Sequence, residues 1–405
     1  MNRKQLCVLL ALVIVLGALG WMLYQRNQTS WQSAGQSIGK KLLGDLPINE
    51  VAALVIRGST NELDLVKKDN RWRVAQRHDY PANYSDISAF LIKAADLKAT
   101  QTEEIGPSQL GRFKLLPPGP ATNTGILVEF KDATGKTLKS LLLGKQHMRK
   151  GAPSTPMGLG EGEEGYPDGR YVMVGTGAKT VALLNDPLGN MDVKPDQWLS
   201  KDFFKVEKIR AIAATFPAAT NSWKVTRDTE TGDWKLADAK PDEKLDSAKT
   251  SNFSYALSSP TFNDVLPLDT QPAPAGWDKP TTITLDTFDH FTYTLKIGAK
   301  TNDNVPVELT VTADLPKERT PGKDEKKEDK DKLDKEFKDK QKVLEDKLAQ
   351  EKPLEKWIYL VSSWTVDPLL KDRSQILVEK KAESKKDGKV GTDDENKDQA
   401  TSEVK

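Results

Sequence analysis

Short runs of alternating apolar and polar residues begin at Pro47 and recur along most of the chain. The first run, Val51 to Arg57, reads VAALVIR, and the sequence LDLVKKDNRWRVA follows it closely. Alternation with a period of two places the apolar side chains on one face of a strand. The sequence Lys68-Asp69-Asn70 has the composition of a turn between two such strands. The pattern therefore predicts an antiparallel meander.

A helix is predicted between this meander and the next set of strands. Its apolar stripe is formed by Ile87, Phe90, Leu91, Ala94 and Leu97. This spacing is typical of a helix that buries one face, and Ser85 or Asp86 is the candidate N-cap. We expect the apolar face to cover one side of the sheet.

The second half of the chain repeats this order. Trp72, at the end of the first meander, has its counterpart in Trp234 of WKVTRDTETGDWKLA. Gly144 in TGILVEFKDATGKTLKSLLLGKQ likewise has its counterpart in Gly298 of TTITLDTFDHFTYTLKIGAKT. Similar separations of the two pairs indicate a domain-sized duplication. We predict an α+β fold of two tandem repeats, residues 47–200 and 201–378, each with an antiparallel sheet and one principal helix.

The N-terminus has a different pattern, with nineteen uncharged residues from Leu6 to Tyr24. At ~1.5 Å per residue, a helix of this length spans most of a ~30 Å hydrocarbon core. A signal peptide cleaved after Ala18-Leu19-Gly20 is the alternative, but the apolar run continues past that site. Residues 1–26 are therefore predicted to be an uncleaved, single-pass transmembrane anchor through residues 6–24. The cations that precede the run place the N-terminus in the cytoplasm.

Three further segments differ from the repeats. Residues 27–46 are polar and interrupted by glycine, which predicts a tether, and residues 379–405 have the composition of a disordered tail. The second repeat carries a charged insertion at about 316–353, at a place that we match to the glycine-rich loop of the first. Acid-first i,i+4 pairs such as Glu328 with Lys332 predict an exposed helix there.

The apolar residues of this insertion are sparse: Leu333, Phe337, Val343, Leu344 and Leu348. We expect no face wide enough to dock on the sheets, and hence an arm that projects into solvent. A short coiled-coil contact is the alternative. Such an arm could reach a partner through its leucines and Phe337.

Composition excludes some classes of protein. Lys plus Arg number 60 and Asp plus Glu 59, so no net field attracts nucleic acid. Cys7 is the only cysteine, so disulfides cannot contribute to stability and no thiol framework identifies the compartment. The sequence does not specify an oligomeric state.

Candidate chemistry is equally sparse. Residues 160–165 match G-x-G-x-x-G, but three glutamates there would repel a pyrophosphate, and no βαβ pattern surrounds them. These acids with Asp168 could hold calcium, although the ligand spacing is wrong and a surface loop is the simpler interpretation. His78, His147 and His290 lie outside any catalytic motif. We assign no catalytic, cofactor-binding or metal residues and no cofactor. Most tryptophans are expected to fill the core, with a sugar-stacking platform as the alternative.

The junction DQWLSKDFFKVEKI between the repeats resembles a motif of the bacterial family called domain of unknown function 4340. In that family a W-x-x-K stretch leads into a V-x-x-I strand, and these positions are Trp198, Lys201, Val206 and Ile209 here. The resemblance covers roughly residues 47–378. It implies a single-pass envelope protein often encoded beside an ABC transporter of the gliding-motility type, with extracytoplasmic modules and no established catalytic residues.

These observations favour a non-enzymatic accessory or scaffold protein of the bacterial cell envelope, anchored in the inner membrane and docked on ABC transporter subunits. The alternative is an exported module that binds a glycan or small ligand in the cleft between the repeats. An enzyme of unknown class is the third hypothesis. Exposed tryptophans in that cleft would favour the second, and a histidine that converges with carboxylates would favour the third.

Overall fold

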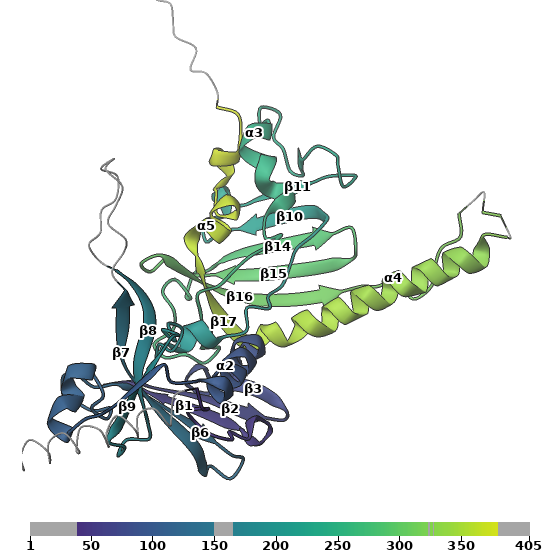
Figure 1. The fold of residues 1–405 in the computed structure, drawn as a ribbon. Coiled ribbons are helices and arrows are strands. Elements are labelled where there is room, and N and C mark those ends of the chain that lie inside the picture. The colour runs from purple at the N-terminus through teal and green to yellow at the C-terminus, as the bar shows by residue number, and fades with distance from the viewer. Residues whose placement is uncertain (1–38, 150–164, 323–324, 327, 380–405) are drawn as a thin grey trace, which may run out of the picture.

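The computed structural model describes residues 39–149, 165–322, 325–326 and 328–379 (Figure 1). The predicted anchor, most of the predicted tether and nearly all of the predicted tail lie outside these ranges. Within the described part of the chain, no helix combines the length and the apolar character that crossing a membrane requires. What is described consists of two antiparallel sheets with a few helices, which confirms the predicted α+β class.

The first module contains one nine-stranded sheet and the helix α2 (Tyr84–Asp96). Its strands are β1 (Ala53–Arg57), β2 (Glu62–Lys68), β3 (Arg71–Val74), β4 (Tyr80–Pro81), β5 (Gln101–Glu104), β6 (Ile126–Lys131), β7 (Thr137–Arg149), β8 (Tyr166–Val174) and β9 (Thr180–Leu184). Short 3-10 helices are η1 (Ile48–Glu50), η2 (Ala75–Arg77), η3 (Pro107–Phe113) and η4 (Pro195–Trp198).

The second module contains one eight-stranded sheet. Its strands are β10 (Ile209–Thr215), β11 (Trp223–Thr226), β12 (Lys235–Leu236), β13 (Asp264–Pro267), β14 (Thr281–Thr287), β15 (Phe291–Ile297), β16 (Asn304–Ala313) and β17 (Trp357–Ser362). Its helices are α3 (Ser247–Thr250), α4 (Lys330–Glu351) and α5 (Ser363–Val366), with the 3-10 helices η5 (Ala219–Asn221), η6 (Ser251–Tyr255), η7 (Lys352–Lys356), η8 (Asp367–Leu369) and η9 (Arg373–Ile376).

The two sheets have the same topology. The order in the first is β4-β3-β2-β1-β6-β7-β8-β9-β5, and in the second it is β12-β11-β10-β14-β15-β16-β17-β13. Apart from β4, every strand of the first sheet has an equivalent at the same place in the second. Trp72 lies in β3, and Trp234 directly precedes its equivalent β12. The internal duplication inferred from the sequence therefore extends to the order of every shared strand.

The paired glycines have a shared packing reason. A Cβ atom added to Gly144 would lie 2.4 Å from the carbonyl oxygen of Phe113, and one added to Gly298 would lie 2.6 Å from that of Ala275. In each module this carbonyl belongs to the segment that leads into the neighbouring strand of the sheet. Only glycine allows so close a backbone approach.

The principal helices differ between the modules. In α2 the N-cap is Asn83, whose side chain accepts from the N–H groups of Ser85 and Asp86, so the predicted cap at Ser85 or Asp86 is wrong by two or three residues. Ile87 and Phe90, which lie on the apolar face of this helix, are buried as predicted. At the place equivalent to α2, the second module has only one turn of α-helix, α3, which continues as η6. Its segment is rich in Ser, Thr and Asn, whose side chains compete for backbone hydrogen bonds.

Helix α4 is inserted between β16 and β17 and extends far from the body of the molecule (Figure 1). The equivalent place in the first module is the turn between β8 and β9. The glycine-rich loop instead connects β7 to β8. Our match of the insertion to that loop is therefore wrong by one hairpin.

Candidate functional site

The two modules meet where β13 of the second lies beside η2 of the first. Arg77 donates through Nε and Nη2 to the two carboxylate oxygens of Asp264, at 2.6 and 2.8 Å. Each of these side chains is 24 % exposed. A bidentate, partly desolvated pair of this kind fixes orientation as well as supplying attraction. It therefore holds the modules in one relative position.

Aromatic rings fill the space beside this ion pair. The ring of Tyr80, from the first module, lies edge-on to the rings of Phe262, Trp357 and Tyr359 of the second, with centroids 4.9 to 6.4 Å apart. Tyr80 and Tyr359 are almost fully buried, and burial raises the pKa of both phenols. Edge-to-face pairs add to the free energy gained from burying the rings. The joint is thus a packed core.

The W-x-x-K junction contributes to the same joint. Trp198 is buried, and the ammonium group of Lys201 lies 3.4 Å from the carbonyl oxygen of Phe262 and 4.6 Å from the centroid of its ring. Burial lowers the pKa of Lys201. Val206 and Ile209 are fully buried in the second module. Of these four residues Lys201 contacts the joint, and the other three are buried, so the role of the motif is structural.

The C-terminal half of α4 docks on the second sheet. Leu344 and Leu348 pack against the core, and Lys340 pairs with Asp289 at 3.0 Å. At the end of the helix, Glu351 is 6 % exposed. The expectation that the arm has no face able to dock is therefore wrong for this half. Spacing from α4 alone could not reveal the fit, because the receiving side chains come from distant strands.

Glu351 is held by two donors from the sheet side. The hydroxyl of Tyr293 donates to its Oε2 at 2.8 Å, and the backbone N–H of Lys205 donates to its Oε1 at 3.1 Å. Burial raises the pKa of the Glu351 carboxyl, and the two hydrogen bonds offset that rise only in part. Sequence reasoning missed this residue, since nothing near Glu351 in the chain distinguishes it from the other acids of the helix.

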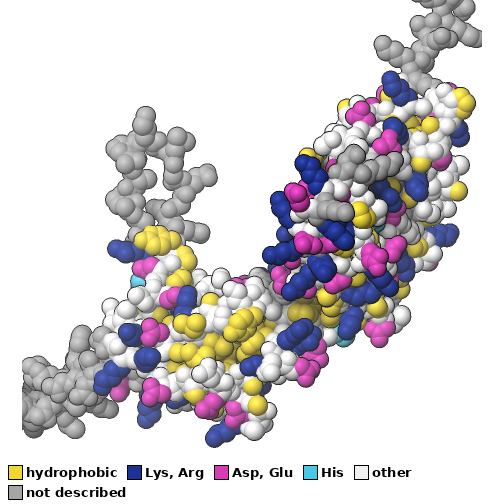
Figure 2. All heavy atoms as spheres, turned by 90° about the vertical axis from the view of Figure 1, so that its right-hand side faces the viewer, with side chains coloured by type: hydrophobic (Ala, Val, Ile, Leu, Met, Phe, Trp, Pro, Cys, Tyr) yellow, Lys and Arg dark blue, Asp and Glu magenta, His cyan; other side chains and the backbone are white. Residues whose placement is uncertain are grey.

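The N-terminal half of α4 projects from the body (Figure 1). Leu333 and Phe337 are half-exposed and are not part of the hydrophobic core of the described residues. The guanidinium group of Arg319 pairs with Glu325 and with Asp334, which clamps the incoming chain against the start of the helix. Figure 2, which looks at the side from which α4 projects, shows basic and acidic side chains intermingled there.

The structure brings together two residues that sequence reasoning kept apart. His147 on β7 and Asp168 on β8 lie within hydrogen-bond distance, with Nδ1 and Oδ1 2.6 Å apart, and the ring of Tyr171 lies 6.1 Å from the imidazole. A histidine oriented by a carboxylate is one part of a proton-transfer site. Among the described residues, no serine or cysteine forms a hydrogen bond with this pair.

The other candidate residues do not converge. His78 and His290 lie at turns with left-handed backbone conformations. Residues 160–164, which make up most of the G-x-G-x-x-G match, lie outside the described residues, as does Cys7. Across the described ranges, no three His, Cys, Asp or Glu side chains are grouped so as to hold a metal ion. The predicted calcium alternative would need residues 161–164, and so it stays untested.

The tryptophans divide into two groups. Trp72, Trp198 and Trp223 are buried, while Trp234 and Trp357 are half-buried against the core. Trp364, at the start of α5, is 63 % exposed. Core filling is thus the role of most of the described tryptophans.

Comparison with known proteins gives one match. A family model described as "Domain of unknown function (DUF4340)" matches residues 72–280, from β3 across the joint to the start of β14. No curated protein and no solved structure matches the chain.

Proposed function

Because this chain belongs to the DUF4340 family, whose match covers just over half of its 405 residues, we propose that it is a membrane-anchored, non-enzymatic accessory protein of the bacterial cell envelope. In this proposal the chain spans the inner membrane once, through residues 6–24, and holds its two modules outside the cytoplasm. The modules act as a scaffold that docks on an ABC-type transporter.

The observation that carries the proposal is the asymmetry between two otherwise equivalent modules. Where the first has a short turn between β8 and β9, the second has a 22-residue helix. One half of this helix is fixed to the sheet by Glu351 and Lys340, which gives the other half a defined direction. The projecting half presents Leu333 and Phe337. A helix with a rigid base and exposed apolar residues is suited to contact a partner.

The joint supports a scaffold over the alternative of a glycan-binding cleft. A sugar platform needs aromatic faces open to solvent. Tyr80, Phe262 and Tyr359 are instead buried against one another. A joint filled in this way makes the two modules one body, which is the property that a scaffold needs. Among the residues that the structure describes, the enzyme hypothesis has the His147–Asp168 pair as its only support.

Co-purification from native membranes tests the docking. The double variant Leu333→Glu with Phe337→Glu should lose the ABC transporter subunits that co-purify with the wild type, because a charged side chain would be buried at the contact. The matched control is Lys335→Glu with Lys342→Glu, which changes two exposed residues on other faces of α4. Loss in both variants or in neither would refute a contact through the apolar residues of the projecting half.

The anchor has a separate test. Intact mass of protein extracted from membranes should include residues 1–24, since the apolar run continues to Tyr24. Recovery of a chain that begins at Trp21 would refute the anchor and leave the docking test unaffected.

A further inference from the structure

The modules are joined by a linker, residues 201–208, which runs from η4 to β10 as an irregular segment. Two side chains of the C-terminal half of α4, its docked base, bond to the main chain of this linker. The N–H of Lys205 donates to Oε1 of Glu351 at 3.1 Å, and the carbonyl of Lys205 accepts from the ammonium group of Lys347 at 2.8 Å. Both main-chain groups of one residue thus find partners on α4, so the docked base holds the linker in place.

Ion pairs on the C-terminal side of the linker add to this grip. Glu207 of the linker lies 3.7 Å from the ammonium group of Lys347. Asp289, at the turn between β14 and β15, pairs with Lys208 of the linker at 2.9 Å and with Lys340 of α4 at 3.0 Å. The carboxylate of Asp289 therefore bridges the linker and the helix.

Aromatic rings connect the linker to the joint. The ring of Phe203, two residues before Lys205, has its centroid 5.0 Å from that of Phe262 and 4.6 Å from that of Tyr359. The rings of Phe262 and Tyr359 in turn lie 5.8 and 6.4 Å from the ring of Tyr80 in the first module. Close-packed side chains transmit small shifts to their neighbours. A shift of the main chain at Lys205 would therefore disturb the packing of the joint.

Helix α4 also continues along the chain into the joint. The 3-10 helix η7 follows Glu351, and β17 then begins at Trp357. The ring of Trp357 lies 4.9 Å from that of Tyr80 in the first module. The docked base of α4 is thus connected to the joint twice, through the linker and through its own chain.

The helix has room to tilt on the second sheet. A cavity of about 390 Å³ lies between them, with Val343 and Leu344 of α4 on one side and Thr287 and Phe291 of the sheet on the other. The ion pairs around this cavity are partly exposed to solvent, and such pairs contribute little free energy each. A tilt of the docked base therefore costs little, either in overlap of side chains or in lost attraction.

We propose that α4 and the joint are coupled, so that displacing the docked base of the helix loosens the contact between the modules. Coupling between two sites is reciprocal, and loosening the joint therefore loosens the docked base as well. This inference extends the docking proposed above, because a partner bound to the projecting half of α4 would then change the relative position of the modules. The coupling itself is a property of the free protein, so its test stands apart from that of docking.

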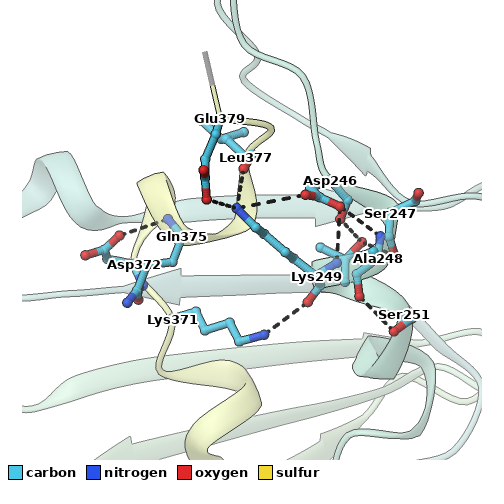
Figure 3. A network of polar contacts seen from close by, with 11 residues as sticks. Asp246, Ser247, Ala248, Lys249, Ser251, Lys371, Asp372, Gln375, Leu377 and Glu379 are labelled. Atoms are coloured by element: carbon cyan, nitrogen blue, oxygen red, sulfur yellow. Dashed lines mark hydrogen bonds and ion pairs between the residues drawn. The ribbon is translucent and has the colours of Figure 1, made fainter. Parts of the chain in front are cut away.

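A second lysine of the same module provides a matched control. Figure 3 shows the ammonium group of Lys249, which donates to the carbonyl of Leu377 at 3.0 Å and lies 3.4 Å from the carboxylate of Glu379. The side chain of Lys249 is 30 % exposed and that of Lys347 is 24 % exposed. Lys249 belongs to α3, at the end of the second module that points away from β17 and the joint (Figure 1). It therefore has the same kinds of partner as Lys347 at a place remote from the joint.

Hydrogen–deuterium exchange of the full chain in detergent, followed by mass spectrometry, tests the coupling, because amide exchange reports local opening. Lys347→Ala should speed exchange about tenfold in the peptides of the joint, residues 75–82 and 262–267, since the loss of one hydrogen bond from a charged donor has an effect of this size. Lys249→Ala removes an equivalent bond elsewhere and should leave exchange in these peptides unchanged.

Two further variants complete the experiment. Asp289→Asn removes the carboxylate that bridges the linker and α4, and this second variant of the docked base should give the same pattern as Lys347→Ala. Arg77→Ala provides the reverse measurement. It breaks the ion pair of the joint and should speed exchange in residues 344–351 of α4.

The proposal is overturned if exchange in the joint stays at its wild-type rate in either folded variant of the docked base. It is also overturned if Lys249→Ala speeds exchange in the joint as much as Lys347→Ala does, because the effect would then be general destabilisation. Unchanged exchange of residues 344–351 in Arg77→Ala would remove the reciprocity that coupling requires.

Discussion

The docked base of α4 gives the sharpest test of the structure, through the bond between Tyr293 and Glu351. Tyr293→Phe removes the hydroxyl and leaves Glu351 Oε2 buried without that donor. A hydrogen bond to a charged group contributes about 1.5 to 3 kcal/mol. We expect the free energy of unfolding to fall by that amount. Glu351→Gln should have a smaller effect at pH 7, since the amide oxygen still accepts from Lys205 and no charge is buried.

The pH dependence of the unfolding free energy provides an independent test of whether Glu351 is buried. Burial raises the pKa of Glu351 in the folded state above its unfolded value of 4.5, with Lys347 opposing the rise and Glu207 adding to it. The folded state therefore binds its proton more tightly than the unfolded state does. The stability from Glu351 is fully present below pH 4.5 and is lost as pH rises through the folded pKa. Relative to Glu351→Gln, the wild type should gain stability as pH falls from 7 to 4.5.

Urea unfolding followed by tryptophan fluorescence measures both effects, with m-values compared to establish that the same transition is observed. Glu345→Gln, at an exposed position of α4, is the control for removing one carboxylate from the helix. A wild-type minus Glu351→Gln difference that is flat with pH would mean that the carboxylate is solvated. The base of the arm would then not be docked as described.

Three further outcomes follow from the packing. Arg77→Ala should destabilise the joint by about 1.5 to 3 kcal/mol, because Asp264 loses a charge-assisted partner. Differential scanning calorimetry should then show that the two modules melt less cooperatively. In urea titrations, Trp72→Ala should reduce the unfolding free energy by about 3 to 5 kcal/mol. Trp234→Ala should reduce it by less, because Trp72 is buried whereas Trp234 is half-buried. Deleting residues 330–337 should leave the melting temperature unchanged, whereas deleting the whole insertion should lower it, since only the C-terminal half packs on the sheet.

The duplication could be inferred from local patterns because each repeat must bury the same face of the same strands. Trp72 and Trp234 end equivalent hairpins, and Gly144 and Gly298 each meet a carbonyl that leaves no room for a Cβ atom. Such requirements act on single positions and leave a visible mark in the sequence. The helix cap was less accurate, since Asn83, Ser85 and Asp86 all have side chains able to cap.

The candidate sites were not visible in the sequence. His147 and Asp168 are 21 residues apart on adjacent strands, and only the register between β7 and β8 brings them into contact. The cavity lined by Asp86 and Asp186 likewise joins α2 to the segment after β9, about a hundred residues later in the chain. No local pattern encodes such pairs, because the two side chains come close to each other only after the backbone has folded.

The sequence by itself thus determined the class of fold, the internal repeat and the helical character of the charged insertion, because hydrophobic period, turn chemistry and i,i+4 charge pairs act over a few residues. Only the tertiary structure decided how the modules join and how the arm is held. Arg77 and Asp264 are separated by 187 positions, and Lys205 and Glu351 by 146. Contacts at such separations depend on the packing of whole sheets, and a pattern along the chain contains no record of which distant partner a side chain will meet.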